Sequence, residues 1–325
     1  MILIMKFTDL LKMIIKKPKF WDNEKKTIIS FLLLPFSFLY LAFFWINKIL
    51  KNSISNKKAT IPVICVGNIY LGGTGKTPLV REIYKIIKSF GKNPAFVKKY
   101  YQYVSDEINM LEKTGRIYAT KKRNTGILLS ASNNHDVAIL DDGFQDFSIK
   151  PSLSIICFNS KQMIGNGQII PSGPLRESLS AIQRADCVII NGDKNLDFEE
   201  KISKFKKYKK LHIFYSKYKV KNIEKFKNKS ITAFAGIGNP TNFFDLLKEN
   251  NLNLTKTFAF PDHHEYSEED FKIINNEKSD KLVTTEKDYN RIDNNQKKKC
   301  EFIEVNLEIE NIEKFKNIIK SYLWN

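Results

Sequence analysis

One segment limits the folds open to this chain more than any other: residues 63–80, which read VICVGNIYLGGTGKTPLV. It opens with a β-branched apolar run typical of a buried strand and passes through a cluster of glycines. It then continues into PLVREIYKIIKSF, where apolar residues recur at helical spacing. Glycines let backbone N–H groups turn inward around phosphate oxygens, and a helix N-terminus attracts the same anion. The segment therefore predicts a phosphate-binding loop between a strand and a helix.

The loop itself supplies candidate residues for binding a nucleotide. Lys76 can reach the β- and γ-phosphates, and the hydroxyl of Thr77 can be a ligand of Mg²⁺. The strict form of this motif has glycine where this chain has Tyr70, so we expect the glycines that follow to form the tight turn. The predicted ATP-binding run is Gly72, Gly73, Thr74, Gly75, Lys76 and Thr77.

Short apolar runs alternate with helical segments after residue 51, in HDVAILDDG, LSIICF and ADCVIING, and again after residue 226, in ITAFAGIGNP and KLVTTEKD. This alternation is typical of an α/β fold in which helices cover a parallel sheet. We therefore expect a P-loop NTPase-type parallel sheet domain over residues 51–225 and a second, smaller Rossmann-like α/β domain over residues 226–325. An N-terminal membrane-associated helical segment over residues 1–50 precedes them.

Residues 28–46, IISFLLLPFSFLYLAFFWI, form an apolar run that no charge interrupts. Its length suits a transmembrane helix. The lysines before it would then lie outside the cell, against the positive-inside tendency, and Pro35 could break the helix. We therefore expect a segment that dips into one leaflet or lies in the interface, with flanking lysines such as Lys25 and Lys48 on anionic headgroups. A full span stays open.

The formal net charge of +18 favours anionic partners, whether phosphate-rich ligands, nucleic acid or acidic lipid. The lysines are spread along the chain and form no dense basic stripe with stacking aromatic residues, so we expect no nucleic-acid partner. The four cysteines form no CxxC pair, which is typical of buried thiols in a reducing compartment.

A membrane-bound GTPase or ATPase switch is the alternative that uses the same loop. A GTPase would carry an N-K-x-D element that reads guanine after a late strand. The matching place holds Asn191-Gly192-Asp193-Lys194, which lacks that order.

Two aspartates end a predicted buried strand in VAILDD. Asp141 and Asp142 can face a metal ion directly or through water, as the second half of a nucleotide site requires. In the loop GNGQIIPSGPLRE, three glycines and two prolines impose a defined shape, and Arg176 could clamp a phosphate with two hydrogen bonds. The spacing alone leaves an exposed turn arginine equally open.

A phosphate acceptor with a hydroxyl group also needs a base. The candidates are Asp106 or Glu107 in VSDEINML, and the cluster Asp262-His263-His264 in FPDHHEY. Adjacent histidines point to opposite sides in most backbone conformations, so at most one of the pair faces a site. A carboxylate assisted by a histidine suits base chemistry better than a zinc site at this spacing, although an exposed loop remains open.

Taken together, these runs resemble the tetraacyldisaccharide 4'-kinase family, the lipid A 4'-kinases. The matching pieces are LLLPFSFLY, VGNIYLGGTGKTP, SDE, LDDGFQ, GNGQIIPSGPLRE, FAGIGNPTNFF, FPDHHEY and VTTEKDYNRI, in family order between residues 31 and 291. The resemblance implies transfer of the ATP γ-phosphate to the 4'-hydroxyl of a tetraacylated glucosamine disaccharide 1-phosphate in lipid A biosynthesis. It also implies Mg²⁺ and the cytoplasmic face of the inner membrane, and we expect a monomer.

The resemblance also implies roles for individual residues. The catalytic positions are Asp106 as the base, His263 as its partner, Lys76 and Arg176. On the metal side stand Thr77, Asp141, Asp142 and Gln145, and near the acceptor substrate stand Tyr101, Arg123 and Glu177.

Two departures from the family pattern stand beside these positions. The family usually has Ser-Arg-Gly-Tyr-Gly after its second strand, whereas the run from Lys98 to Gln102 reads KKYYQ; Tyr101 keeps the tyrosine and Lys99 replaces the arginine. The family motif DDGFQH ends here in Asp146. Altered handling of the acceptor, lower activity and drift towards loss of activity all stay open.

Overall fold

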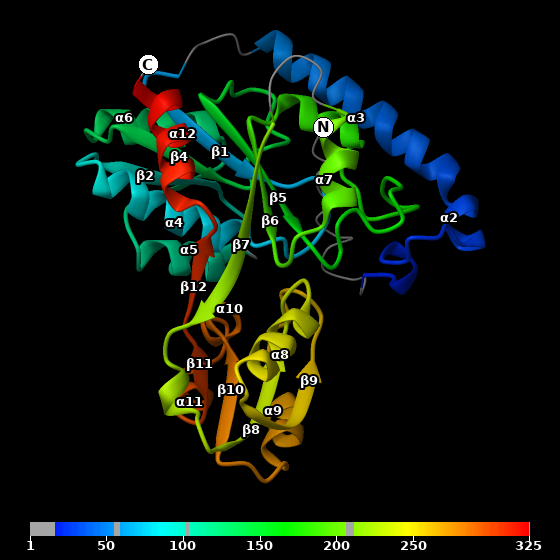
Figure 1. Cartoon of the computed structure of the whole chain (residues 1–325), viewed down its shortest axis with the longest axis vertical. Coiled ribbons are helices and arrows are strands. Elements are labelled where there is room, and N and C mark those ends of the chain that lie inside the picture. The colour runs from blue at the N-terminus through cyan, green and yellow to red at the C-terminus, as the bar shows by residue number, and fades with distance from the viewer. Residues whose placement is uncertain (1–16, 55–58, 102–103, 206–210, 325) are drawn as a thin grey trace. The chain divides into compact units, whose positions relative to one another are not determined.

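A computed structural model describes residues 17–54, 59–101, 104–205 and 211–324 of the chain (Figure 1). Residues 1–16 of the predicted N-terminal segment and Gln102 of the KKYYQ run lie outside this range. The described residues form two compact units. The larger unit takes those within 19–102, 111–217 and 307–325, and the smaller takes those within 1–18, 103–110 and 218–306.

The larger unit is built around a sheet with strand order β12-β7-β6-β5-β1-β4-β2-β3. The strands are β1 (Val63–Gly67), β2 (Pro94–Lys99), β3 (Ile117–Thr120), β4 (Val137–Asp141), β5 (Leu153–Asn159), β6 (Cys187–Asn191), β7 (His212–Val220) and β12 (Val305–Ile309). Every neighbouring pair from β3 to β7 is parallel. The residues of β1, β4 and β5 are all buried, as continuous apolar runs predict for strands covered on both faces.

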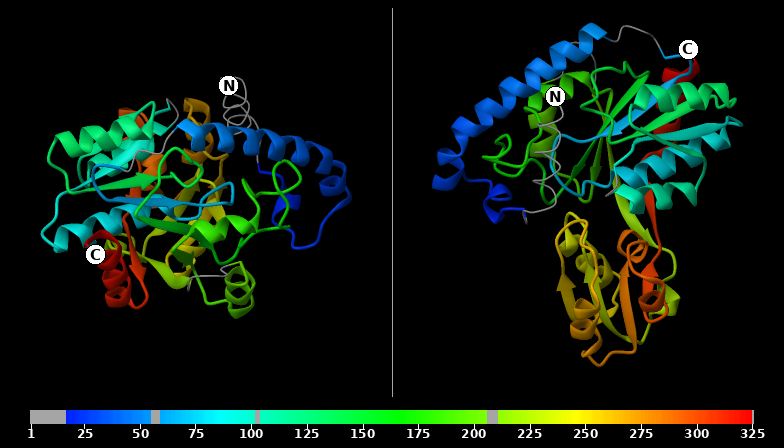
Figure 2. Two further views of the ribbon diagram at one scale, coloured as in Figure 1. Left: turned by 90° about the horizontal axis from the view of Figure 1, so that it is seen from above. Right: turned by 180° about the vertical axis from the view of Figure 1, so that it is seen from behind.

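Helices lie against both faces of this sheet (Figures 1 and 2). They are α4 (Lys76–Ser89), α6 (Arg123–Ser132), α7 (Leu196–Ser203), α12 (Ile312–Trp324) and the 3-10 helix η3 (Leu179–Arg184); α5 (Ser105–Glu112) begins in the smaller unit. In α4 the buried residues Leu79, Ile83 and Ile87 recur at helical spacing, so one stripe of the helix faces the sheet.

The apolar segment 28–46 forms two helices, α2 (Ile28–Leu32) and α3 (Leu34–Ile54), which follow the short helix η1 (Lys19–Trp21). The expected break at Pro35 falls instead at Leu33. Pro35 lies in the first turn of α3, where a missing N–H group leaves no helical hydrogen bond unmade.

One side of α3 is tied to the larger unit. Ser37 Oγ donates a hydrogen bond to the Ile169 carbonyl at 2.8 Å and accepts one from the Ser172 N–H at 3.2 Å. Tyr40 Oη donates to the carbonyl of Arg176 at 3.2 Å. These bonds fix the helix to the GNGQIIPSGPLRE loop, so α3 is part of the folded unit and not a detached anchor.

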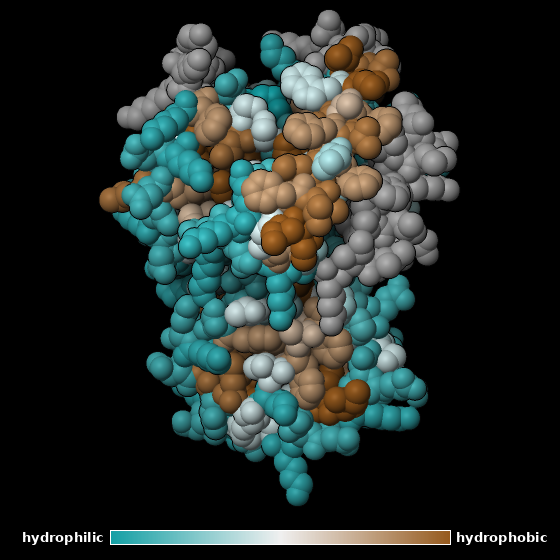
Figure 3. All heavy atoms as spheres, turned by 90° about the vertical axis from the view of Figure 1, so that its right-hand side faces the viewer, coloured by the Kyte–Doolittle hydropathy of each residue, from teal (hydrophilic) through white to brown (hydrophobic). Residues whose placement is uncertain are grey.

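The opposite side of α2 and α3 exposes large apolar side chains, which gather in the upper part of Figure 3. They include Ile28, Leu32, Phe36, Phe38, Leu39, Phe43, Trp45, Ile46, Ile49 and Leu50, each about half exposed or more. Within the described residues, no helix combines the length and apolar character needed to cross a bilayer.

The smaller unit has an all-parallel sheet with strand order β11-β10-β8-β9. The strands are β8 (Ser230–Ala235), β9 (Asn253–Ala259), β10 (Lys281–Thr285) and β11 (Glu301–Ile303). Its helices are η4 (Ile223–Lys225), α8 (Pro240–Glu249), α9 (Glu268–Asn275), α10 (Glu286–Tyr289) and α11 (Asn294–Lys297). Ser267 caps α9 in a capping box with Asp270, so the predicted start of that helix is confirmed.

Side chains of β8 alternate between two apolar clusters. Ile231 and Ala233 pack in one cluster with Phe243 and Leu247 of α8. Phe234 packs in the other, with Phe271 of α9 among its neighbours. This period of two places a core on each face of the small sheet.

The two units divide the chain differently from the predicted domains 1–50, 51–225 and 226–325. The closing helix α12 belongs to the larger unit, and the first part of α5 belongs to the smaller. The predicted boundaries stay a prediction about which parts fold on their own.

Candidate active site

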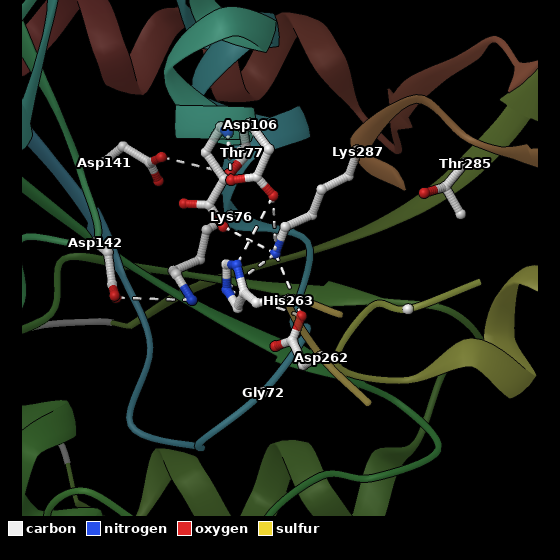
Figure 4. Close-up of polar contacts among 12 residues, drawn as sticks. Gly72, Lys76, Thr77, Asp106, Asp141, Asp142, Asp262, His263, Thr285 and Lys287 are labelled. Carbon is white, nitrogen blue, oxygen red and sulfur yellow. Dashed lines mark hydrogen bonds and ion pairs between the residues drawn. The ribbon is translucent and has the colours of Figure 1, made fainter. Parts of the chain in front are cut away.

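The phosphate-binding loop leaves β1 and ends at the N-terminus of α4 (Figure 4). Gly72 has φ 134° and Gly75 has φ 86°, values in the left-handed region that favours glycine. Gly75 is the N-cap of α4, and Lys76 and Thr77 are the first two residues of that 14-residue helix. The first N–H groups of the helix have no partner within it, and these are the groups that bind phosphate.

A buried asparagine shapes the loop from inside. Asn68 Nδ2 donates to Thr74 Oγ1 at 3.0 Å and to the Gly72 carbonyl at 3.3 Å. This contact links the end of β1 to the middle of the glycine run. Sequence reasoning gave Asn68 no role, because asparagine between a strand and a glycine loop is common.

Tyr70, the departure from the strict motif, is fully buried. Its hydroxyl donates to the carboxylate of Asp22, and its backbone forms an antiparallel bridge with Leu175. Next to it, the Leu71 N–H donates to the Pro174 carbonyl at 2.8 Å, and the Arg176 N–H donates to the Ile69 carbonyl at 2.7 Å. The tyrosine therefore helps to join the phosphate loop to the loop that carries Arg176.

Asp142 lies between two cations at the end of β4. Arg176 Nη1 donates to Asp142 Oδ1 at 3.0 Å and to Oδ2 at 3.2 Å, and Lys76 Nζ lies 3.6 Å from Oδ1. Burial alone would lower the pKa of Arg176, but Asp142 raises it above its ordinary value. Two predicted phosphate ligands, Lys76 and Arg176, thus converge on one carboxylate (Figure 4 shows the Lys76 side).

Asp141 is completely buried at the same strand end. Its Oδ2 accepts from Thr77 Oγ1 at 3.3 Å and lies 2.6 Å from the ammonium of the buried Lys98. Its Oδ1 has no hydrogen-bond partner within the part of the chain that the structure describes. This buried oxygen can therefore accept a hydrogen bond from a water molecule bound to a metal ion beside Thr77.

The other predicted positions of the larger unit form one network around this strand end. Gln145 Nε2 donates to the Asn68 carbonyl at 2.8 Å and to Glu177 Oε1 at 3.0 Å. Glu177 is buried and also accepts two bonds from Arg184, both at 2.9 Å. Gln145 and Glu177 are thus joined by a hydrogen bond, and both lie close to Arg176, whose Nη1 is 3.4 Å from Gln145 Oε1.

Arg123 occupies the start of α6 and donates to the Asp142 carbonyl at 2.7 Å and to Asp146 Oδ2 at 3.1 Å. Burial raises the pKa of Asp146, but the charge of Arg123, the hydrogen bond from Ser148 and the charge of Lys51 together outweigh it, so the net shift of the pKa is downward. Asp146, the departure from the family histidine, is thus an ion-pair partner of a predicted site residue. Tyr101 lies at the end of β2 with Lys99 Nζ 4.9 Å from its ring centroid.

The smaller unit holds the predicted base. Asp106 is 2 % exposed, and its Oδ2 accepts from Nε of Arg291 at 2.8 Å and also from Nη2. Its Oδ1 accepts from the Glu107 N–H at 2.8 Å. Arg291 Nη1 donates to the Gly236 carbonyl at 2.8 Å and to Asp288 at 3.1 Å. Asp106 is therefore held in one orientation by an arginine 185 residues away in the sequence.

The two adjacent histidines point to different partners. His263 Nδ1 lies 3.8 Å from Asp106 Oδ2, whereas His264 Nε2 lies 2.9 Å from Asp270 at the start of α9. His264 also stacks on Phe260. Only one of the pair faces the predicted base, as their adjacency in the sequence suggested.

Lys287 completes this cluster in the smaller unit (Figure 4). Its Nζ lies 3.1 Å from Glu107, 3.4 Å from Asp262 and 3.3 Å from His263 Nε2. Burial, followed by the charge of Lys287, lowers the pKa of His263 to about 4. Burial alone would also lower the pKa of Lys287, but Asp262 and Glu107 raise it above its ordinary value.

The charged residues of these clusters that sequence reasoning missed include Lys98, Lys287 and Arg291. Each follows or ends a strand of a parallel sheet, since Lys98 lies in β2 and the other two follow β10. Charged residues at the carboxyl ends of parallel strands are a signal for a site, and VTTEKDYNRI carries it.

A glycine loop at a helix N-terminus, strand-end aspartates and converging cations define the class: an α/β enzyme with a P-loop that transfers phosphoryl groups. The family model described as tetraacyldisaccharide-1-P 4'-kinase matches residues 29–323. The chain belongs to the tetraacyldisaccharide-1-P 4'-kinase family, and it is an ATP-dependent kinase that acts on a lipid disaccharide.

Similar proteins agree with this assignment. A tetraacyldisaccharide 4'-kinase of Pelagibacter ubique is 40 % identical over 301 residues, covering 91 % of this chain and 94 % of that protein. One of Rickettsia canadensis is 32 % identical, covering 95 % and 98 %. The crystal structure of LpxK from Aquifex aeolicus, in complex with ATP, superimposes with a TM-score of 0.71 at 24 % identity and covers 91 % of this chain and all of that one. This last likeness shows the fold.

Proposed function

We propose that the chain transfers the γ-phosphate of ATP to the 4'-hydroxyl of a tetraacylated glucosamine disaccharide 1-phosphate, and that it does so at a membrane surface. The observation that carries the proposal is the convergence of Lys76 and Arg176 on Asp142 beside the glycine loop. Because one carboxylate already holds these two cationic side chains close together, both can bind the oxygens of the same phosphoryl group.

Positioning and charge provide most of the rate enhancement in phosphoryl transfer. The N–H groups at the start of α4 and the ammonium of Lys76 bind the β- and γ-phosphates. Arg176 presents its planar guanidinium to the transferring group, a geometry that a lysine cannot reproduce. The Asn68 contacts keep Gly72 and Thr74 in the curve that makes this binding possible.

The residues at the end of β4 fit a Mg²⁺ ion. Thr77 and Asp142 would hold it together with Asp141, whose partnerless Oδ1 suits a metal-bound water, and Gln145 completes the predicted set. When bound, the ion offsets the negative charge that the phosphates carry. Lys98 keeps Asp141 fixed through its other oxygen, which supports an intact metal side despite the altered KKYYQ run.

Asp106 is the proposed base. The proton of the acceptor hydroxyl passes to its carboxylate as the hydroxyl oxygen forms its bond to the γ-phosphorus. The bond between that phosphorus and the oxygen that bridges it to the β-phosphate breaks, and ADP leaves. Arg291 fixes the position of the carboxylate, and His263 Nδ1 lies 3.8 Å from the same Oδ2. Tyr101, Arg123 and Glu177 are proposed to orient the acceptor, with Arg123 and Glu177 anchored by their own ion pairs.

The exposed apolar side of α2 and α3 is proposed to lie in the membrane interface at the cytoplasmic face of the inner membrane. The protein is proposed to act there as a monomer. Apolar surface of this extent marks a contact with a partner or a membrane. Lys25, Lys26 and Lys48 flank it and suit anionic headgroups. A cavity of about 170 Å³ between α3 and η3, lined in part by Leu41, Phe44 and Ala181, supports entry of an acylated substrate from this side.

The test is direct. Purified protein is incubated with Mg-ATP and the disaccharide 1-phosphate in detergent, and the lipid is analysed by mass. The proposal predicts one added phosphate, lost in Lys76→Met and kept in Lys85→Met, a lysine of the same helix that pairs with Glu82. An unchanged lipid mass with ATP bound at the loop would contradict the proposed acceptor.

A further inference from the structure

Among the described residues, three groups lie within 3.4 Å of the Lys287 ammonium, and Asp106 Oδ2 lies farther away, at 4.0 Å. The three groups are Glu107 Oε1 at 3.1 Å, His263 Nε2 at 3.3 Å and Asp262 Oδ1 at 3.4 Å. Thr285 caps α10 with a bond from the Asp288 N–H at 3.1 Å, and this fixes the turn from which Lys287 extends. The lysine is therefore a fixed part of the cluster and not a surface side chain.

This contact restricts the state of His263. An ammonium only donates hydrogen bonds, so the nitrogen that it contacts must accept with a lone pair. In a neutral imidazole the proton is then on the other nitrogen, Nδ1, which lies 3.8 Å from Asp106 Oδ2.

Arg291 also approaches this ring, with Nη2 3.5 Å from Nδ1. Its Nε and Nη2 already donate to Asp106, and its charge is spread over three nitrogens. Lys287 is closer and carries its charge on one atom, so its contact decides which ring nitrogen accepts.

We propose that Lys287 is a positioning residue that holds His263 neutral, with its proton on Nδ1 and directed at Asp106. The inference rests on the proposed roles of Asp106 and His263. It adds the residue that determines which nitrogen of His263 carries the proton. Protonated His263 would be a third cation beside Lys287 and Arg291, and its Nε2 would lose the lone pair that accepts from Lys287. The nearby carboxylates, those of Asp106, Glu107, Asp262 and Asp288, already pair with these two cations.

The backbone supports a fixed ring. His263 has φ 60°, a left-handed value that is uncommon for a non-glycine residue. Its N–H donates to the Gly236 carbonyl at 3.2 Å, and the same carbonyl accepts from Arg291 Nη1 at 2.8 Å. The low pKa of His263, about 4, which burial and then Lys287 cause, agrees with the neutral ring.

NMR of the full-length protein labelled in its histidines tests this directly. The chain has four histidines, so the ring signals can be assigned with His263→Asn. In the wild type we expect His263 to remain neutral down to about pH 5 in the Nδ1–H form. In Lys287→Met its titration moves up by more than about one pH unit and the two tautomers mix, whereas in Lys287→Arg it stays low.

His264 is the internal control, because it pairs with Asp270 and has no contact with Lys287. Its signal should be unchanged in all variants, which also shows that the smaller unit is folded. In the kinase assay, kcat of Lys287→Met should fall about tenfold or more with KM for ATP unchanged.

Two results would overturn the inference. One is a wild-type His263 with its proton on Nε2, a measurement that needs no variant. The other is a His263 titration that is the same in Lys287→Met and the wild type. Both readouts are independent of activity, so a failure of the proposed lipid kinase reaction would be seen separately, in the mass assay.

Discussion

Arg176 donates from a single nitrogen to both carboxylate oxygens of Asp142, at 3.0 and 3.2 Å, while Lys76 stands 3.6 Å from the same carboxylate. The carboxylate holds the two cations in place before any phosphate arrives. These three residues are far apart in the sequence. The fold of the larger unit brings them together, because β1 pairs with β4 and the segment after β1 forms a bridge with the GNGQIIPSGPLRE loop.

Replacing Arg176 by lysine should lower kcat by about 10²-fold or more and leave the fold intact. Lysine keeps the charge but lacks the planar fork that places two nitrogen donors on one phosphoryl group. Single-turnover kinetics with Mg-ATP measure the effect. Arg116→Lys is the matched control, since Arg116 stacks over Tyr118. A rate within about twofold of the wild type would remove Arg176 from the proposed phosphate grip.

Replacing Arg291 by methionine should destabilise the smaller unit by about 3–5 kcal/mol, because Asp106 is buried and loses its partner. Urea unfolding measures this loss. The double variant Asp106→Asn with Arg291→Met should recover part of it, since the carboxylate left without a cation is then gone. If the loss of stability in the double variant equals the sum of the losses in the two single variants, the pair is not coupled.

His263 should make the smaller unit less stable in mild acid. Its pKa in the folded chain is about 4, below the usual value of about 6.5 that the unfolded chain restores. Between pH 6.5 and pH 4 the unfolded state binds a proton that the folded state does not, so this contribution to stability is lost as the pH falls.

At pH 5 this effect amounts to about 2 kcal/mol relative to pH 7.5. The free energy of unfolding of the wild type and of His263→Asn is compared at both values. The difference between the two proteins should shift in favour of the variant at pH 5. A constant difference would show that His263 titrates alike in the folded and unfolded chain.

Replacing Phe38 and Leu39 by serine should weaken binding to vesicles that contain anionic lipid by about tenfold or more. Both side chains are more than half exposed, and each loses part of the roughly 1.5–3 kcal/mol that its transfer into an apolar phase supplies. Vesicle sedimentation measures the binding. Leu196→Ser is the control, since Leu196 in α7 is a leucine even more exposed than Leu39. Unchanged sedimentation would locate membrane contact elsewhere.

Local patterns predicted the parts of the site that lie close in the sequence. The glycine loop, the start of α4 and the aspartates after β4 all follow from strand and helix signals within residues 63–142. The same holds for the apolar segment, although its helices break at Leu33 and continue to Ile54. An uncharged run predicts a helix, but its ends depend on caps and on the contacts of Ser37 and Tyr40 with a distant loop.

Long-range pairs lie beyond such reasoning. The Asp106–Arg291 pair closes a gap of 185 residues, and the Lys98–Asp141 pair joins two neighbouring strands of the sheet. The roles of Asp106 and His263 came from the resemblance to a family, because a carboxylate near a helix start and a histidine in a loop have many ordinary uses. Only the fold shows that Arg291 and Lys287 surround them.

The central claim is that Asp106 takes the proton of the acceptor hydroxyl while the loop at Lys76 holds ATP. Single-turnover phosphate transfer to the lipid disaccharide by Asp106→Asn tests it, with ATP affinity measured in parallel. Asp280→Asn is the control, an aspartate of the same unit whose carboxylate accepts hydrogen bonds from the N–H and hydroxyl of Ser230. We predict an ATP affinity within about twofold of the wild type and a transfer rate lowered by about 10²-fold or more. Transfer at the wild-type rate would contradict the account.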